Sequence, residues 1–395
     1  MSTTAPTRPV RASGRPDRRP PSRPGAGLPA RVTVVGGGVV ALLTAVECVL
    51  DGHLVTVVGG GAVPDAGAAS PGRHRVLRAL HPADPSATRA ALRAHHRWVE
   101  LEELLMTRFY ERAGALTVLP PAAAAEGAAL VESAGGTARE LTAAGLSHRY
   151  PHLRLDGGLG AVLEEEAGVL LAGRVLAACA GWLKWQRGVR LVEHRAVTAV
   201  DGASGTVRLA DGRAVHGDAV LVAVDPRSRE LLPEGVAERL TLYRQSLLHC
   251  RVPPHQARAW AATPAVAFPG TPGGARLVPP VAGTGLKLTS AAARRAVGEI
   301  TDHTTDPYWQ RSLEREFGDL LPGFGPAWVT AAEDSYHAAF APAGGTAPAA
   351  LGGAGYAYAA DGGTSFAFAP LVARSLADRL AGGSPPPRRD FDDSP

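Results

Sequence analysis

The chain has 395 residues, of which 45% are apolar and 20% charged, so it is long enough for two domains and has the composition of a globular protein. Six of its 41 basic and one of its 37 acidic residues fall in residues 1–30, which leaves a balanced body of 35 basic and 36 acidic residues. That balance gives no nucleic-acid-binding footprint, and no apolar run is long enough to cross a membrane.

Residues 1–30 are rich in Pro, Arg, Ser and Gly, which predicts a disordered basic tail. No apolar region follows Arg18-Arg19, so we reject a twin-arginine export signal. Cys48, Cys179 and Cys250 are odd in number and far apart, and they predict neither a disulfide framework nor a metal site. We therefore expect a cytoplasmic protein.

The first ordered stretch, residues 31–61, reads RVTVVGGGVVALLTAVECVLDGHLVTVVGGG. It predicts a strand over 31–35, a glycine turn, a helix over 39–50 and a second strand over 54–58. Gly36, Gly38 and Ala41 have the GxGxxA spacing of a dinucleotide-binding turn, in which small residues let backbone N–H groups reach a pyrophosphate.

The alternative is an ordinary strand–helix–strand unit with a glycine turn and no ligand. One observation favours it, because Gly59 stands where an acid normally ends the second strand and holds the adenosine ribose. Asp65, in the following loop, is a candidate substitute.

The rest of the chain alternates helix and strand patterns and shows no internal repeat. Helices are predicted over 86–114, in pieces of 121–146 that break at Gly135-Gly136, and over 172–186, 307–320 and 370–380. Strands are predicted over 116–119, 161–171 (a strand, a turn and a strand), 189–194, 207–224 (a hairpin with Asp211-Gly212 at its turn), 240–252 (in a second sheet) and 262–285 (short strands with turns). The end of the chain repeats the opening order, with a small-residue strand, a Gly362-Gly363 turn and a helix, which implies an interleaved second domain.

In this order the segments resemble the D-amino-acid oxidase (DAO) superfamily of flavoproteins, and most closely its monomeric sarcosine oxidase-like branch. The likeness covers about residues 31–385. It lies in VVGGGVVALLTAVECVLDGHLVTVV, SPGRHRVLR, EEEAGVLLAGRVLAACAGWL, GLKL at 285–288 and GGTSFAFAPLVARSLADRL at 362–380.

The resemblance implies an α/β fold with a Rossmann-type (GR2) FAD-binding domain, interleaved with an α+β substrate domain on a mixed β-sheet. The expected division is a tail at 1–30, an FAD-binding domain from 31–80, 150–235 and 330–385, a substrate domain from 81–149 and 236–329, and a tail at 386–395.

The resemblance also implies roles for single residues. Arg75 would lie beside the flavin ring, Arg78 would pair with a substrate carboxylate, and Lys287 would lie near the reactive edge of the flavin and assist oxygen reduction. The expected FAD-binding residues are Val35, Gly36, Gly38, Ala41, Ser70, Arg75, Gly362, Gly363, Thr364 and Phe366.

The residue pattern around Lys287, one of only two lysines in the chain, favours the same role as the resemblance does. It lies between Leu286 and Leu288 on a predicted strand, where an ammonium is costly unless it points into a polar cavity. The alternative is a lysine on a solvated strand face, and for Arg75 and Arg78 it is solvated surface charge.

Several positions depart from the family pattern. Asp334 or a neighbour stands where sarcosine oxidases have the cysteine bonded to flavin, so we expect non-covalent FAD. Ala367 replaces the second carboxylate-binding cation, which weakens the substrate clamp. The other departures are Gly59, Asp225, Ala291, Ala360 and Ser365.

The leading hypothesis is an FAD-dependent oxidoreductase that oxidises a C–N bond of an amine or amino-acid-like substrate to an imine, on a specialised-metabolite intermediate, with O2 or another electron acceptor. The alternative is a flavin-poor descendant that acts as a non-redox enzyme or a binding partner. An NAD(P)-dependent dehydrogenase is weaker, because it leaves GLKL and the C-terminal segment without a role. We expect no nucleic-acid or membrane partner, and the oligomeric state stays open.

Overall fold

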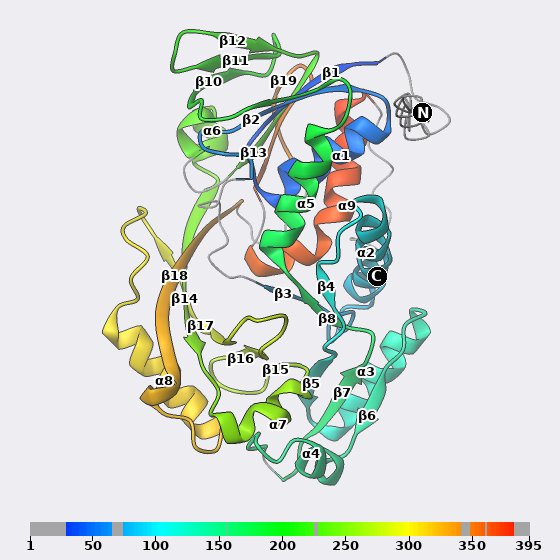
Figure 1. The fold of residues 1–395 in the computed structure, drawn as a ribbon, viewed down its shortest axis with the longest axis vertical. Helices are drawn as coiled ribbons and strands as arrows, with labels where there is room; N and C mark the ends of the chain where they lie inside the picture. Colours follow the sequence, from blue (N-terminus) through cyan, green and yellow to red (C-terminus); the bar gives the residue numbers. More distant parts are fainter. Residues whose placement is uncertain are drawn as a thin grey trace, which may run out of the picture.

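The computed structural model describes residues 29–64, 74–155, 157–224, 228–340, 348–359 and 362–382, with only the backbone at 362–365. Its strands form two large sheets and two three-stranded sheets (Figure 1). One of the small sheets, that of β3 (Arg75–Leu77), β8 (Gly168–Leu170) and β4 (Tyr110–Glu111), lies near the junction of the large ones.

The first large sheet has six strands, in the order β19-β20-β13-β1-β2-β9. They are β19 (Ala349–Gly352), β20 (Gly355–Ala359), β13 (Ala219–Val224), β1 (Arg31–Val35), β2 (Leu54–Val58) and β9 (Val189–Val192). All neighbours are parallel except β19 and β20. The predicted unit of strand, glycine turn, helix and strand is confirmed, because α1 spans Val39–Leu50 between β1 and β2.

The two faces of this sheet are buried by different layers. Val34 and Val57 pack against α1, α5 (Ala172–Lys184) and α9 (Gly362–Leu380), whereas Val35 and Val58 pack toward a three-stranded sheet. The strands of that smaller sheet are β10 (Val197–Asp201), β11 (Thr206–Leu209) and β12 (Ala214–His216). Burial on both faces explains the continuous β-branched composition of these strands.

The second large sheet has eight strands, in the order β18-β14-β17-β16-β15-β5-β7-β6. They are β18 (Val329–Phe340), β14 (Leu240–Cys250), β17 (Leu286–Val297), β16 (Ala275–Val278), β15 (Ala265–Phe268), β5 (Ala115–Leu119), β7 (Gly160–Glu164) and β6 (Arg139–Leu141). Only β15 and β5 are parallel neighbours, so the sheet is mixed, and the predicted α/β fold with two kinds of sheet is confirmed.

The remaining elements cover the sheets or join them. A small antiparallel sheet contains β3 (Arg75–Leu77), β8 (Gly168–Leu170) and β4 (Tyr110–Glu111). The other helices are α2 (Pro85–Leu104), α3 (Pro121–Ser133), α4 (Ala143–Arg149), α6 (Glu234–Ala237), α7 (Ala257–Ala261) and α8 (Pro307–Leu320). Figure 1 shows α8 on the outer side of β14, β17 and β18. Within the described ranges no helix combines the length and the apolar character needed to span a membrane.

The helix predicted over 86–114 is wrong over its last ten residues. The α2 helix ends at Leu104, and Met106 adopts a left-handed φ of +50°. Glu102 Oε1 then accepts the N–H groups of Phe109 and Tyr110, at 2.6 and 2.8 Å, and the chain enters β4. Leu105 and Phe109 are therefore buried by a reversal of the chain and not by a continued helix.

The predicted start of the last helix is also wrong. The α9 helix begins at Gly362, so the glycine pair forms its first turn and Pro370 lies inside it. A proline in a helix leaves carbonyls without partners in the preceding turn. Trp98 Nε1 donates to the carbonyl of Ala367, in the turn before Pro370, at 2.8 Å.

The predicted division into domains stays a prediction, and the sheets bear on it at two places. Both β7 and β18 belong to the eight-stranded sheet, although the division assigns residues 150–235 and 330–385 to the FAD-binding domain.

Candidate functional site

The glycine turn after β1 is held by close backbone contacts. Gly36 has φ +127°, a conformation that favours glycine, and a Cβ added there would lie 3.1 Å from the carbonyl oxygen of Ala223 on β13. Its N–H donates to the Val58 carbonyl at 2.9 Å, and Ala41 lies directly against it. The first and last small residues of the motif are therefore needed for close packing.

The N-terminus of α1 is open. Gly38 is its N-cap residue, no side chain caps the helix, and a Cβ at Gly38 would meet no atom within 4 Å. Free N–H groups at a helix N-terminus attract an anion. The open space beside Gly38 fits a pyrophosphate, and the assignment of Val35, Gly36, Gly38 and Ala41 to FAD binding stays a prediction.

The missing ribose acid has a packing reason. A Cβ at Gly59 would lie 2.8 Å from Cγ2 of Val63, a residue that is 2% exposed and belongs to the core under α1. Glu193, which the sequence did not single out, follows β9 and accepts the Val63 N–H at 2.8 Å. The proposed substitute Asp65 lies outside the described residues.

The strand register gives the eight-stranded sheet two different faces. One row crosses five strands with leucine or valine at every position: Leu116, Val266, Leu277, Leu288 and Leu248. This row lies in the core beneath α4, α7 and α8. Neighbouring residues along each strand point to the opposite face, which carries polar side chains: Thr117, Arg276, Thr289, Lys287 and His249.

Lys287 lies on this polar face and is 9% exposed, so it is not on a solvated strand face. Its Nζ donates to the carbonyl of His74, next to β3, at 3.4 Å. Burial lowers the pKa of Lys287 to about 7, the positive charge of Arg75 adds to the effect, and Glu333 opposes it. At neutral pH the ammonium and amine forms are both populated.

Two histidines that sequence reasoning missed accompany Lys287. His74 is 1% exposed, and burial together with Lys287 lowers its pKa to about 3, so its ring is neutral. His249 is the register partner of Lys287 on β14, and its Nε2 lies 3.1 Å from Oε2 of Glu333 on β18. No local pattern could show these contacts, because they join segments far apart in the chain.

Arg75 and Phe366 are brought together, although their roles stay predictions. The guanidinium of Arg75 donates to the His74 carbonyl at 3.0 Å, and its Cζ lies 5.8 Å from the centre of the Phe366 ring. The Phe366 ring stacks on Trp98 with a centroid separation of 5.7 Å. Burial lowers the pKa of Arg75 to about 10. The sequence had connected neither residue with Trp98.

The other expected FAD-binding residues are less defined. Gly362, Gly363 and Thr364 form the start of α9, where only the backbone is described, and Ser70 lies outside the described residues.

Arg78 follows β3 and is half-buried, so it is not a solvated surface residue. Glu164, 4% exposed at the end of β7, accepts the N–H groups of Ala79 at 2.6 Å and Leu80 at 3.1 Å. Burial lowers the pKa of Arg78, the positive charge of Arg276 lowers it further, and Glu164 opposes both. Glu164 thus fixes the backbone beside Arg78, a role that the sequence did not indicate.

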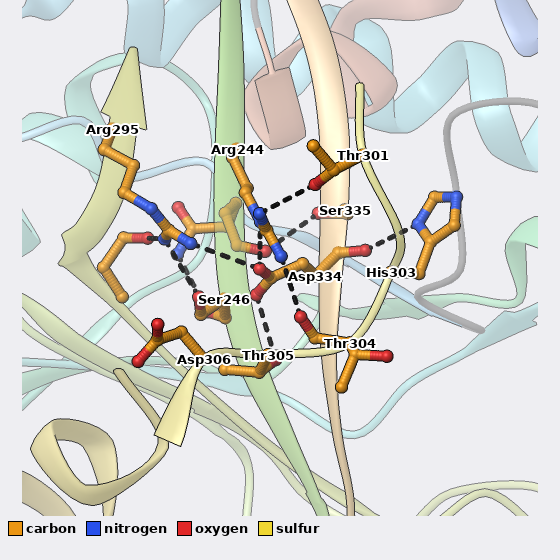
Figure 2. Close-up of polar contacts among 12 residues, drawn as sticks. Arg244, Ser246, Arg295, Thr301, His303, Thr304, Thr305, Asp306, Asp334 and Ser335 are labelled. Atoms are coloured by element: carbon orange, nitrogen blue, oxygen red, sulfur yellow. Dashed lines mark hydrogen bonds and ion pairs between the residues drawn. The ribbon is translucent and has the colours of Figure 1, made fainter. Parts of the chain in front are cut away.

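Asp334 does not reach the Lys287 side of the sheet. Figure 2 shows Arg244 and Arg295 converging on its carboxylate, which is completely buried. Arg295 donates to Oδ2 at 3.2 Å, Arg244 contacts the same oxygen, and Thr305 donates to Oδ1 at 2.9 Å. Arg295 also lies over Trp309 of α8, so the group, which we call the Asp334 cluster, joins the sheet to the layer of α8.

The other departures can be placed only in part. Ala367 is 7% exposed in the core under α9, where a cation would be buried. Ala291 is exposed on β17. Asp225 and Ala360 lie outside the described residues, and the side chain of Ser365 is not described. In the described part of the chain no group of three metal-binding side chains occurs.

Comparison with solved structures shows the same architecture at low sequence identity. NikD, an amino acid oxidase essential for nikkomycin biosynthesis, is 20% identical with a TM-score of 0.71, over 89% of this chain and 93% of NikD. L-proline dehydrogenase from P. horikoshii is 17% identical with a TM-score of 0.76, over 91% and 95% of the two chains. Amadoriase I, a fructosyl amine:oxygen oxidoreductase from Aspergillus fumigatus, is 17% identical with a TM-score of 0.71, over 90% and 87%.

No curated protein matches the chain. The model of one protein family does match, over residues 31–379, and it describes FAD dependent oxidoreductases. The match begins at β1, includes the glycine turn, Arg78 and Lys287, and ends one residue before the end of α9. The chain therefore belongs to the DAO family of FAD-dependent oxidoreductases.

Proposed function

We propose that this protein oxidises a C–N bond of an amine or amino-acid-like substrate, a CH–NH or CH–NH2 group, to an imine, using non-covalently bound FAD. The structures similar to it include an amino acid oxidase, a proline dehydrogenase and a fructosyl amine oxidoreductase, all of which act on such groups by name. The electron acceptor is O2 or another oxidant. The substrate is a specialised-metabolite intermediate, since Ala367 removes one expected contact with a small amino acid.

The observation that carries the proposal is the position of Lys287. Lys287 is a buried lysine on the polar face of the eight-stranded sheet. Its Nζ donates to the carbonyl of His74, in the segment that also carries Arg75 and Arg78. A cation held at such a place stabilises negative charge that develops during reaction.

The residues of the chain would have the following roles. The turn from Gly36 to Ala41 and the N-terminus of α1 would hold the FAD pyrophosphate. Bound FAD would supply the redox chemistry by accepting a hydride equivalent from the carbon next to nitrogen. Arg78 would orient an acidic group of the substrate, and Lys287 would favour negative charge on oxygen or flavin. We also place the protein in the cytoplasm, because its three cysteines are free and buried.

The test begins with the absorbance spectrum of the purified protein. We expect flavin bands that are lost on acid precipitation of the protein, since attachment is non-covalent. Anaerobic addition of amines and N-alkyl amino acids should bleach the flavin, and air should restore the colour if oxygen is the acceptor.

Two outcomes would contradict the proposal. Well-folded protein that binds no added FAD would favour the flavin-poor descendant. Flavin that alcohols or hydroxy acids reduce, and amines do not, would contradict the assignment to C–N bonds.

A further inference from the structure

We propose that Arg276 on β16 is a substrate-binding residue, and that Arg276 and Arg78 together hold a carboxylate group of the substrate. This inference rests on the proposed function, because it concerns the amine or amino-acid-like substrate of the same site. It supplies the second cation that is missing at Ala367.

The strand register places Arg276 on the polar face. Arg276 is the partner of Thr289 on β17 and of Ala267 on β15, and Ala267 is in turn the partner of Thr117 on β5. Partners in a sheet point to the same face, so Arg276 shares the face of Lys287, which lies two residues from Thr289 on the same strand. This is the face toward β3 and Arg78.

The charge near these two arginines is not balanced. Within the described part of the chain neither Arg78 nor Arg276 has a hydrogen bond or ion pair from its guanidinium, and each is close enough to the other for repulsion to lower the pKa of Arg78. Glu164 attracts Arg78, but its two oxygens already accept backbone N–H groups.

Another arginine pair of the same sheet shows what is missing. Arg244 and Arg295 also converge, and the buried Asp334 lies between them. A carboxylate offers two oxygens to guanidinium donors, so it meets the requirement of both pairs. Arg276 and the segment that carries Arg78 lie on one face of the sheet, and among the described residues no protein carboxylate binds either guanidinium, so a carboxylate of the substrate would serve both.

The side chain of Arg276 is accessible to a ligand, and a polar group without a partner lies in the same row of the sheet. This side chain is solvent-exposed, yet burial by surrounding atoms still lowers the pKa of its guanidinium. Thr117, in the same row, is 1% exposed. Its buried Oγ1 has no hydrogen-bond partner in the described part of the chain. A buried hydroxyl without a partner is costly unless a ligand or a water satisfies it.

The test compares a carboxylate with its uncharged amide. Isothermal titration calorimetry on the purified protein, with the FAD it contains, measures binding of phenylacetate and phenylacetamide. We expect wild type to prefer phenylacetate, and Arg276→Gln to weaken phenylacetate binding roughly ten- to hundredfold while phenylacetamide binding is unchanged. Arg276→Lys should weaken phenylacetate binding less than Arg276→Gln does. Arg208→Gln, an exposed arginine of β11, serves as the matched control and should change neither.

A second measurement separates binding from folding. In buffer without carboxylates, Arg276→Gln should melt at the same temperature as wild type or higher, because it removes repulsion from Arg78. Adding phenylacetate should then raise the melting temperature of wild type more than that of the variant.

Each contrary outcome overturns the inference. One such outcome is equal phenylacetate affinity in wild type and Arg276→Gln. Another is that wild type does not prefer phenylacetate over phenylacetamide in the millimolar range, and a third is that Arg276→Gln loses much of its stability. Neither measurement requires flavin reduction, so the inference and the proposed oxidation can fail separately.

Discussion

The eight-stranded sheet carries a cluster of buried charge on each face, and the two clusters are built differently. On the α8 side, Asp334 is completely buried and has Arg244, Arg295 and Thr305 as partners (Figure 2). On the β3 side, cations predominate. Lys287 has a backbone carbonyl as its hydrogen-bond acceptor, and Arg78 and Arg276 repel each other.

The difference separates a structural cluster from a candidate site. The cost of burying Asp334 is offset by ion pairs and hydrogen bonds within the protein. On the β3 side burial lowers the pKa of Lys287 and of Arg78, and the charges of Arg75 and Arg276 add to the effect, a cost that a protein carries where a ligand or reaction uses the charge. The buried charge that has partners within the protein therefore fits a structural role. The buried charge without such partners is the candidate for function.

The largest expected effect is on the balanced side. Asp334→Ala would leave two partly buried arginines, Arg244 and Arg295, without the carboxylate that they share, so we expect a loss of about 3 kcal/mol in the free energy of unfolding. Urea denaturation followed by circular dichroism measures it. As a control, Glu165→Ala removes an exposed partner of Arg139 and should cost no more than about 1 kcal/mol. Equal effects of the two substitutions would remove the Asp334 cluster from its structural role.

Lys287→Met tests the unbalanced side. We expect reoxidation of the reduced flavin by O2 to slow about a hundredfold, because a positioned positive charge near the developing anion is lost, while FAD binding survives. Stopped-flow absorbance measures the rate. The matched control is Lys184→Met, since Lys184 is the other lysine of the chain and is exposed at the end of α5. Unchanged reoxidation in Lys287→Met would place oxygen chemistry elsewhere.

Arg78→Ala should weaken apparent substrate affinity roughly tenfold or more, because a charge-assisted hydrogen bond to the substrate is lost. Steady-state kinetics with the best amine found in the spectral test measures the change in KM. Arg89→Ala on the exposed side of α2 is the control. A KM equal to that of wild type would assign Arg78 to packing near Glu164.

A separate prediction concerns the pH dependence of stability on the unbalanced side. The pKa of Lys287 is about 7 in the folded protein, against the ordinary lysine value of 10.5 in the unfolded chain. Below pH 7 both states bind the proton and the burial cost is fully present, whereas between pH 7 and 10.5 the unfolded state binds more protons and stability rises. Wild type should gain up to about 1.4 kcal/mol per pH unit there relative to Lys287→Met.

Denaturation of both proteins at several pH values measures this gain. The variant should be the more stable of the two at low pH, by a margin that shrinks as pH rises. A constant margin would mean that Lys287 keeps an ordinary pKa.

The elements that the sequence predicted well have local causes. The limits of β1, α1 and β2 follow from β-branched runs, helical periodicity and the glycine turn, all within residues 31–58. Predictions failed where distant contacts decide. The α2 helix ends early because Glu102 binds the returning backbone, and α9 continues through Pro370 in contact with Trp98.

The candidate site shows the same division. The sequence by itself determined the nucleotide-binding turn and singled out Lys287, because glycine geometry and a charged residue between leucines are properties of a few neighbouring residues. Only the tertiary structure decided that Lys287 meets His74, that Asp334 lies on the other face with two arginines, and that Arg276 shares the face of Lys287. Strand register fixes the face of each side chain, and register is set by pairing between segments far apart in the chain.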